Sequence, residues 1–299
     1  MVTLPAGRSI APRRRLSLAR RLALTIGRLV RHRFALLGIV LLALEIGAAL
    51  LAPWLAGYAP NAIDYRAMLQ APSFDHLLGT DDLGRDILSR LIHGGRLSLT
   101  VSTLAVLMAV SVGVPLGLIA GYVGGAVDEV LMRVLDSIMA LPPLVLALMI
   151  AAVLGPGLIN AMIAIAIVAV PVYTRLMRGQ VLSLKHNDYI AAAQSVGVPA
   201  WLILFRHVLP NAINPVIVQA SLGIGFAIIT ESSLSFIGLG AQPPISTWGS
   251  MVQVGFQFLE LAPWFVLAPA TAIFVAVLGF NMLGEGLRDA LDPTTSTRL

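Results

Sequence analysis

The sequence predicts an all-α membrane protein whose chain crosses the bilayer six times. Three observations support this fold class. Of the 299 residues, 58% are hydrophobic and only 12% are charged, which is too apolar for a soluble domain of this length. The apolar residues also gather into runs close to the roughly 20 residues that an α-helix needs to cross a membrane. The runs cover residues 34–55, 97–122, 130–154, 158–177, 213–237 and 264–287.

The distribution of lysine and arginine predicts the orientation of the chain, because cytoplasmic loops of membrane proteins are enriched in them. With both termini inside, sixteen of the 20 basic residues fall on the cytoplasmic side. The other four lie in one long outer loop, residues 57–96, together with five aspartates. Nine arginines within residues 8–33 directly precede the first apolar run. We interpret them as a cytoplasmic anchor and not as a nucleic-acid-binding arm.

These features divide the chain into four segments. Residues 1–33 form a basic cytoplasmic N-terminal arm, and residues 34–96 comprise the first span with its outer segment. Residues 97–287 hold the other five spans and an inner loop at about 184–210, and residues 288–299 form a cytoplasmic tail. The outer segment is too short to build a core of its own, so we expect a small cap on the helix ends.

The second predicted span carries a glycine at every fourth position, at Gly113, Gly117 and Gly121. One face of this helix therefore lacks side chains, which lets another helix approach closely. The neighbouring helix belongs either to the same chain or to a partner subunit, and the spacing fits both alternatives.

The inner loop is longer than a turn between two spans requires. Asp188 is suited to cap a helix, residues 191–193 are alanines that favour one, and Gly197 is suited to the left-handed conformation that ends one. The small side chains predict a thin helix that fits a groove on another protein. A helix that lies among the lipid headgroups is the alternative.

Charged residues in two other regions are functional candidates. Glu45 in the first span and Glu231 near the outer end of the fifth are ionisable groups inside the membrane, which makes them candidates by default. For Glu45, a protonated or hydrogen-bonded packing role is the alternative, and Glu231 is the better candidate for a transport pathway. In the outer loop, the aspartates and arginines of residues 79–96 predict either an ion-paired cap or a docking surface for a soluble partner.

Recognised enzyme motifs are absent from the sequence. A phosphate-binding loop requires Gly-Lys-Ser/Thr, but the only lysine, Lys185, follows Leu184. The motifs His-Glu-x-x-His and Gly-x-Ser-x-Gly do not occur, there is no cysteine, and the five histidines have no metal-ligand spacing. We therefore expect a chain that is not an enzyme and has no metal or cofactor of its own.

Several motifs resemble, in order along the chain, those of one family. Residues 189–211 (YIAAAQSVGVPAWLILFRHVLPN) are similar to the coupling loop of ABC-importer permeases, although Ala191 stands where that family usually has glutamate. The outer motifs at residues 76–81 (HLLGTD), 84–86 (GRD) and 234–240 (LSFIGLG) resemble those of peptide-importer permeases. So does the C-terminal motif at residues 280–293 (FNMLGEGLRDALDP). The combination is similar to the C-type permease subunit of dipeptide, oligopeptide, glutathione and nickel importers.

The resemblance implies the type I ABC-importer permease fold, in the inner membrane of a bacterium, with residues 97–287 as the transmembrane domain. It also implies partners: a homologous second permease that completes a heterodimer, two ATPase subunits that bind ATP and Mg²⁺, an extracytoplasmic substrate-binding protein, and the lipid bilayer. The implied cargo is a di- or oligopeptide, or a related compound such as glutathione or a nickel complex. The alternative function is a secondary transporter driven by an ion gradient, with the two intramembrane glutamates as a proton relay.

Candidate site residues also follow from the resemblance. Those expected to couple the chain to the ATPase subunits are Asp188, Tyr189, Ala191, Ala192, Ala193, Gly197, Arg206, Leu209 and Pro210. Those expected to face the binding protein are Asp81, Gly84, Arg85, Asp86, Pro243, Pro244 and Trp248. With Asp188 as the N-cap, position 191 would be the third residue of its helix, so a glutamate there would close a capping box that Ala191 cannot form.

Overall fold

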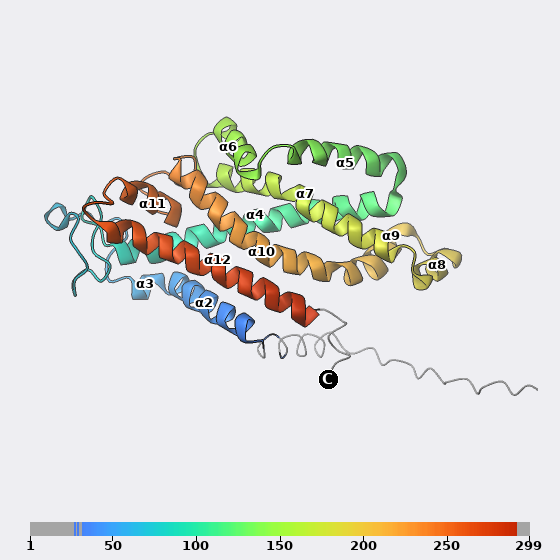
Figure 1. Cartoon of the computed structure of the whole chain (residues 1–299), viewed down its shortest axis with the longest axis horizontal. Helices are drawn as coiled ribbons and strands as arrows, with labels where there is room; N and C mark the ends of the chain where they lie inside the picture. The colour runs from blue at the N-terminus through green and yellow to red at the C-terminus, as the bar shows by residue number, and fades with distance from the viewer. Residues whose placement is uncertain (1–26, 28, 30–31, 292–299) are drawn as a thin grey trace, which may run out of the picture.

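The computed structural model describes residues 27, 29 and 32–291, so the predictions for the basic arm and for most of the C-terminal tail fall outside the described residues. Helices make up most of the described chain, and they run along the long axis of an elongated bundle (Figure 1). Within this part, extended backbone pairs at one isolated bridge, between Thr80 and Asp86.

Five helical runs in the described residues are long and apolar enough to cross a membrane, and a bent pair of helices makes a sixth if the pair is counted as one broken span. The five are α2 (Arg33–Leu50), α4 (Ile87–Val123), α7 (Leu158–Leu184), the continuous run Ala200–Phe236 and α12 (Pro263–Leu291). The fourth run contains α9 (Ala200–Ile203), a π-helical turn (Leu204–Val208) and α10 (Leu209–Phe236). Shorter elements join them: α3 (Ala52–Leu55), a 3-10 turn (Tyr65–Ala67), α8 (Asp188–Ser195) and α11 (Trp248–Phe256).

Residues 130–154 do not form the single span that we expected. The structure places two helices there, α5 (Gly125–Met139) and α6 (Pro143–Leu154), which are bent by 88° relative to each other. The break falls at the Pro142-Pro143 pair, and Pro142 itself has the extended ψ of 133°. A proline lacks a backbone N–H and disfavours helix in the residue before it, so two in succession end the helix. Apolar content alone does not reveal such a break.

The second span begins before its predicted start at residue 97. The first residue of α4 is Ile87, where the carboxylate of Asp86 accepts a hydrogen bond from the backbone N–H of Ser89 at 2.7 Å. Hydropathy misses these first turns because they contain serine, arginine and histidine. The structure nevertheless buries Ser89 and Arg90 beneath the outer segment.

The glycine stripe of α4 packs against α7 of the same chain. A β-carbon at Gly113 would lie 2.8 Å from the Cβ of Tyr173, and one at Gly117 would lie 2.7 Å from the Cβ of Met177. Neighbouring β-carbons do not approach this closely, so α4 and α7 can pack at this distance only because the stripe has no side chains. The intrachain alternative is therefore confirmed.

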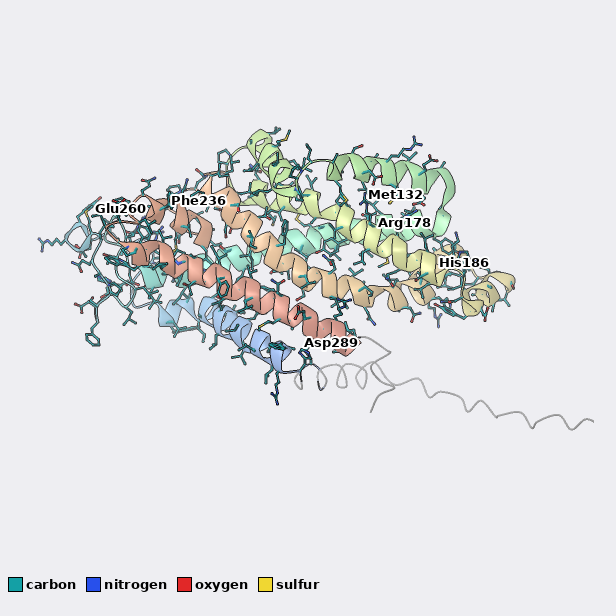
Figure 2. All side chains as sticks on the ribbon, in the orientation of Figure 1. Met132, Arg178, His186, Phe236, Glu260 and Asp289 are labelled. Atoms are coloured by element: carbon teal, nitrogen blue, oxygen red, sulfur yellow. The ribbon has the colours of Figure 1, made fainter. Side chains whose placement is uncertain are left out.

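Ion pairs join α5 to the second half of α7. The Arg178 guanidinium contacts the Asp128 carboxylate twice, Nε to Oδ1 at 2.5 Å and Nη2 to Oδ2 at 2.6 Å. Arg175 pairs with Asp136 nearby. Figure 2 shows Arg178 on α7 where that helix passes beside α5. These contacts hold α5 on the bundle, although Leu135 is its only buried residue.

An ion-paired cap, residues 57–86, covers one end of the bundle. Asp81 is fully buried at its centre and accepts hydrogen bonds from the backbone N–H of Arg85 at 2.9 Å and from Nε of the same residue at 2.6 Å. Nε of the buried Arg90 lies 3.4 Å from the same carboxylate. Burial raises the pKa of Asp82 above its usual value, and the negative charge of the neighbouring Asp81 raises it further. The cap that the sequence predicted as one of two alternatives is therefore present.

Replacing Asp81 by alanine should unfold this cap. The substitution leaves the buried Arg90 without its carboxylate, and removing one partner of a buried ion pair costs about 3–5 kcal/mol. We expect a lower melting temperature and faster proteolysis within residues 57–86. The exposed Asp75, which makes no ion pair in the described chain, provides the matched control. Equal stability of Asp81→Ala and Asp75→Ala would show that the ion pairs do not hold the cap.

The two ends of the bundle are predicted to face opposite sides of the membrane. Figure 2 labels His186, near α8, at one end and Glu260 at the other. Because the chain lacks cysteine, single cysteines at Ser73, Ser195 and Ile245, all exposed, can be labelled with an impermeant reagent. We expect labelling from outside at positions 73 and 245 but not at 195. The reverse pattern would invert the predicted orientation.

Candidate functional site

The inner loop begins with α8, as the sequence predicts, but the first turn differs from the prediction. Asn187, and not Asp188, occupies the N-cap position, and no side chain caps the helix. Position 191 is therefore the fourth residue of α8. A glutamate in place of Ala191 would not close a capping box, so that expectation is wrong.

Gly197 ends α8 in the left-handed conformation. Its φ is +77° and its N–H donates to the carbonyl of Gln194 at 3.0 Å, while the N–H of Val198 donates to the carbonyl of Ala193 at 3.1 Å. These two bonds form the Schellman motif, which satisfies the last carbonyls of a helix. A β-carbon at Gly197 would meet nothing within 4 Å. The backbone conformation, and not lack of space, therefore favours glycine here.

The inner loop presents an apolar surface at the end of the bundle. Ile190 is fully buried and anchors α8, whereas Trp201 is 63% exposed and Phe205 is 61% exposed. Large aromatic side chains exposed at the end of a helical bundle are typical of a protein contact surface and also of the membrane–water interface, so both alternatives for the inner loop stay open. Of the predicted coupling residues, those exposed are Asp188, Tyr189, Ala191, Ala192, Gly197, Arg206 and Pro210, and those half-buried are Ala193 and Leu209.

The residues predicted to face a soluble partner lie at the opposite end, and most of them are covered by the chain itself. The buried ones are Asp81, Gly84, Asp86 and Trp248. Internal contacts explain their burial: Asp81 and Asp86 hold the cap and α4, and the Trp248 Nε1–H donates to the carbonyl of Leu91 at 3.0 Å. These four residues present no surface to a partner, which corrects our expectation. Arg85 is mostly covered, and Pro243 and Pro244 are exposed.

Glu231 lies in a buried polar cluster that fixes the start of α11. Its carboxylate accepts hydrogen bonds from Oγ of Ser98 at 3.2 Å and from Oγ of Ser235 at 2.8 Å. Ser98 Oγ in turn accepts from the backbone N–H of Trp248 at 3.2 Å. The cluster thus joins α4, α10 and α11 at a point where Glu231 is fully buried. Sequence reasoning missed the serines because hydroxyl groups in a span carry little signal before their partners are known.

Glu45 lies elsewhere, on α2. Its Oε2 is buried and has no hydrogen-bond partner among the described residues. The side chain lines a hollow next to α12 together with Trp264. No contact joins Glu45 to Glu231 in the described part of the chain, so a direct relay between them is not built into this fold. Their roles in transport stay predictions.

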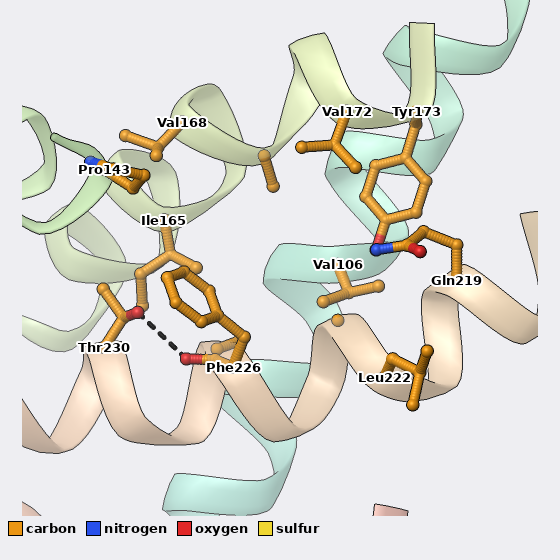
Figure 3. A pocket seen from close by; sticks show the side chains of 13 residues that line it. Val106, Pro143, Ile165, Val168, Val172, Tyr173, Gln219, Leu222, Phe226 and Thr230 are labelled. Atoms are coloured by element: carbon orange, nitrogen blue, oxygen red, sulfur yellow. Dashed lines mark hydrogen bonds between the residues drawn. The ribbon is translucent and has the colours of Figure 1, made fainter. Parts of the chain in front are cut away.

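An apolar cavity, which we call the upper chamber, lies between α7 and α10 (Figure 3). Its volume is about 390 Å³. Three polar side chains interrupt the wall, those of Tyr173, Gln219 and Thr230. The Tyr173 hydroxyl points toward the amide of Gln219 in Figure 3, and Oγ of Thr230 donates to the carbonyl of Phe226 at 2.9 Å. The remaining wall is apolar and comprises Val106, Pro143, Ile165, Val168, Ala169, Val172, Leu222, Gly223, Phe226 and Ala227.

A second cavity, the lower chamber, adjoins the first toward the end of the bundle that carries α8. Its volume is about 510 Å³, and Gln219 and Leu222 line both chambers. The ends of α7, α10 and α12 enclose it. Its wall is more polar than that of the upper chamber and includes Gln180, Asn211, Asn214, Gln219 and Arg288. Sequence reasoning did not identify these residues, although amides within apolar spans were a signal that it could have used.

Comparison with known proteins shows the family of the chain. Residues 113–297, which include the inner loop and most of both chambers, match the family described as binding-protein-dependent transport system inner membrane component. The chain belongs to this family. The permease also matches, at residues 21–72, the N-terminal transmembrane domain of oligopeptide transport permease C. It is therefore a membrane component of a transport system, as the sequence motifs predicted.

Curated relatives align with the permease over most of its length. It is 49% identical over 270 residues to the dipeptide transport system permease protein DppC of Escherichia coli, covering 88% of this chain and 90% of that protein. It is 47% identical over 265 residues to DppC of Alkalihalophilus pseudofirmus, covering 89% and 87%. It is 44% identical over 267 residues to the glutathione transport system permease protein GsiD of Pectobacterium atrosepticum, covering 89% of each chain.

The fold of the permease resembles that of a solved ABC importer. A chain of the MetNI methionine ABC transporter, in an inward-facing conformation, aligns with a TM-score of 0.55 and covers 68% of the permease and 96% of that chain. The two sequences are 15% identical, so the likeness concerns the fold. It confirms an ABC-importer permease fold and not that of a secondary transporter.

Proposed function

We propose that the permease forms half of the membrane passage of an ATP-driven importer for di- or oligopeptides. The observation that supports this proposal is the groove formed by the upper and lower chambers between α7 and α10. The groove extends from an apolar region within the spans to a polar region near the inner loop. A homologous second permease would close the groove into a passage between two chains.

Separate ATPase subunits are expected to drive transport, because the sequence of the permease has no phosphate-binding loop. Their contact surface would be the exposed part of the inner loop around Trp201 and Phe205. ATP and Mg²⁺ would bind to those subunits and not to this chain. A substrate-binding protein would deliver cargo at the opposite end, where Pro243 and Pro244 are exposed.

Peptides are the cargo that the relatives and the groove favour together. The relatives are named for transport of dipeptides, of D,D-dipeptides and of glutathione. A passage for peptides of varied sequence needs a mainly apolar wall with few fixed hydrogen-bonding groups, which describes the upper chamber. ATP binding would draw the inner loops of the two permeases together, and the passage would open to one side of the membrane at a time.

Filling the upper chamber tests this proposal. Ala169→Trp places a large ring in the wall of the chamber and should abolish uptake of a labelled tripeptide by proteoliposomes that contain the complete importer. Val153→Trp is the matched control, because Val153 on α6 is 87% exposed and lines neither chamber. Normal uptake by Ala169→Trp would show that cargo does not pass through this groove.

A further inference from the structure

Of the described residues that line the lower chamber, one is charged: Arg288, an exposed residue near the end of α12. Arg288 has no ion pair or hydrogen bond in the described part of the chain. By contrast, each of the arginines of α5 and α7, Arg133, Arg175 and Arg178, pairs with a carboxylate. The adjacent Asp289 contacts His32 at 3.2 Å. A cation that lines a cavity and pairs with no described carboxylate is suited to bind an anion that enters the cavity.

Amide side chains line the same chamber as this cation. Gln180 of α7 and Asn214 and Gln219 of α10 are half-buried, line the lower chamber and make no side-chain hydrogen bonds in the described residues. Asn211 donates through Nδ2 to the carbonyl of His207 at 2.7 Å, which leaves its own Oδ1 available. An amide offers both donors and an acceptor. The chamber can therefore pair with the N–H and C=O groups of a peptide next to a carboxylate.

We infer that the lower chamber is a binding site for the carboxylate end of a peptide, with Arg288 bound to the carboxylate and the amides of Gln180, Asn214 and Gln219 bound to the adjoining peptide groups. The inference rests on the proposed function and adds the chemistry that the site recognises. A guanidinium matches a carboxylate because its planar N–H groups contact both oxygens at once. Among the described residues, no acidic side chain lines the chamber to compete with the ligand.

The two chambers would then act in sequence. A carboxylate in the upper chamber meets no charged side chain there, whereas Arg288 attracts it from the lower chamber. Gln219, which lines both chambers, would contact the peptide in either position. The lower chamber is therefore the last contact of the cargo before it leaves on the side of the inner loop.

Alkylation of a cysteine inside the lower chamber can report its occupancy. Leu176→Cys lines the chamber, keeps every polar side chain of the proposed site and introduces the only cysteine of the permease. The complete importer in lipid nanodiscs, without nucleotide, is treated with a maleimide in the presence of trialanine or of trialanine with a C-terminal carboxamide. We expect trialanine to slow alkylation. The carboxamide should need about a tenfold higher concentration to slow it equally, because it cannot form the charge-assisted hydrogen bond between a carboxylate and Arg288.

Variants of Arg288 identify the group that binds the carboxylate. Arg288→Gln should remove the difference between trialanine and its carboxamide, and Arg288→Lys should retain most of it. Arg133→Gln, which removes a charge from an exposed position on α5, should leave the difference unchanged. Equal protection by the two peptides in the parent protein, or an unchanged difference in Arg288→Gln, would overturn the inference.

A lipid phosphate at Arg288 would give a different result. The alkylation rate would then depend on the anionic phospholipid content of the nanodisc and not on trialanine, and this outcome would also overturn the inference. Uptake of labelled trialanine by the same importer in proteoliposomes tests the proposed function separately from the proposed carboxylate site. Absence of uptake would contradict the proposed function, whereas uptake without carboxylate-specific protection would contradict only the site at Arg288.

Discussion

Gly117→Leu should prevent the permease from folding. A β-carbon at Gly117 would lie 2.7 Å from the Cβ of Met177 and 3.0 Å from the backbone nitrogen of Arg178, so α4 and α7 would have to separate. Backbone atoms cannot rotate away as a flexible side chain does. We expect a loss of about 3 kcal/mol or more, at the upper end of what overpacking costs. The measurement is the yield of monodisperse protein and its melting temperature in detergent.

Gly179→Leu is the matched control for this prediction. Gly179 is a helical glycine of α7, and a β-carbon there would meet nothing within 4 Å. Leucine at this position should be tolerated and should favour helix slightly, because glycine is less favourable than other residues inside a helix. If both variants fold equally well, the close approach of α4 and α7 does not depend on the glycine stripe.

Gly197→Arg should abolish transport while leaving the permease folded in the membrane. At φ +77° a residue with a β-carbon costs about 1 kcal/mol, which a large membrane protein tolerates. The arginine side chain would project into open space beside α8, where we propose that the ATPase subunit docks. We expect the variant to lose both peptide uptake and copurification of the ATPase subunits.

Gly125→Arg separates a docking defect from backbone strain. Gly125, the first residue of α5, also has a positive φ, +56°, and open space around its β-carbon position. It should carry similar strain and retain uptake. Normal recruitment of the ATPase subunits by Gly197→Arg would instead show that α8 is not the coupling element.

Local rules predicted several parts of the fold from the sequence. Gly197 was identified as the end of α8 because a helix that stops in the left-handed conformation favours glycine at that position. The runs of apolar residues identified the five long helices because bilayer thickness fixes the length of a spanning helix, but they did not reveal the break between α5 and α6. The N-cap of α8 was wrong by one residue because Asn187 and Asp188 are both suitable caps, and local preference does not choose between adjacent ones.

Other features depend on which helices become neighbours, and the sequence does not state this. The lower chamber forms because the ends of α7, α10 and α12 meet, which brings Gln180 and Arg288 to one cavity from positions far apart in the chain. Burial of Asp81 likewise follows from its contact with Arg90, which turns an expected partner-facing residue into an internal one. Motif resemblance located these segments but did not show which side chains are accessible.

ATP hydrolysis and peptide uptake, measured on the same proteoliposomes with and without the ATPase subunits, test the central claim most directly. That claim is that the permease provides the passage and receives its driving force from separate subunits. We expect the permease alone to hydrolyse no ATP and to take up no peptide, and the complete importer to do both in the presence of the binding protein. Hydrolysis by the permease alone, or peptide uptake driven by a proton gradient without the ATPase subunits, would contradict the account.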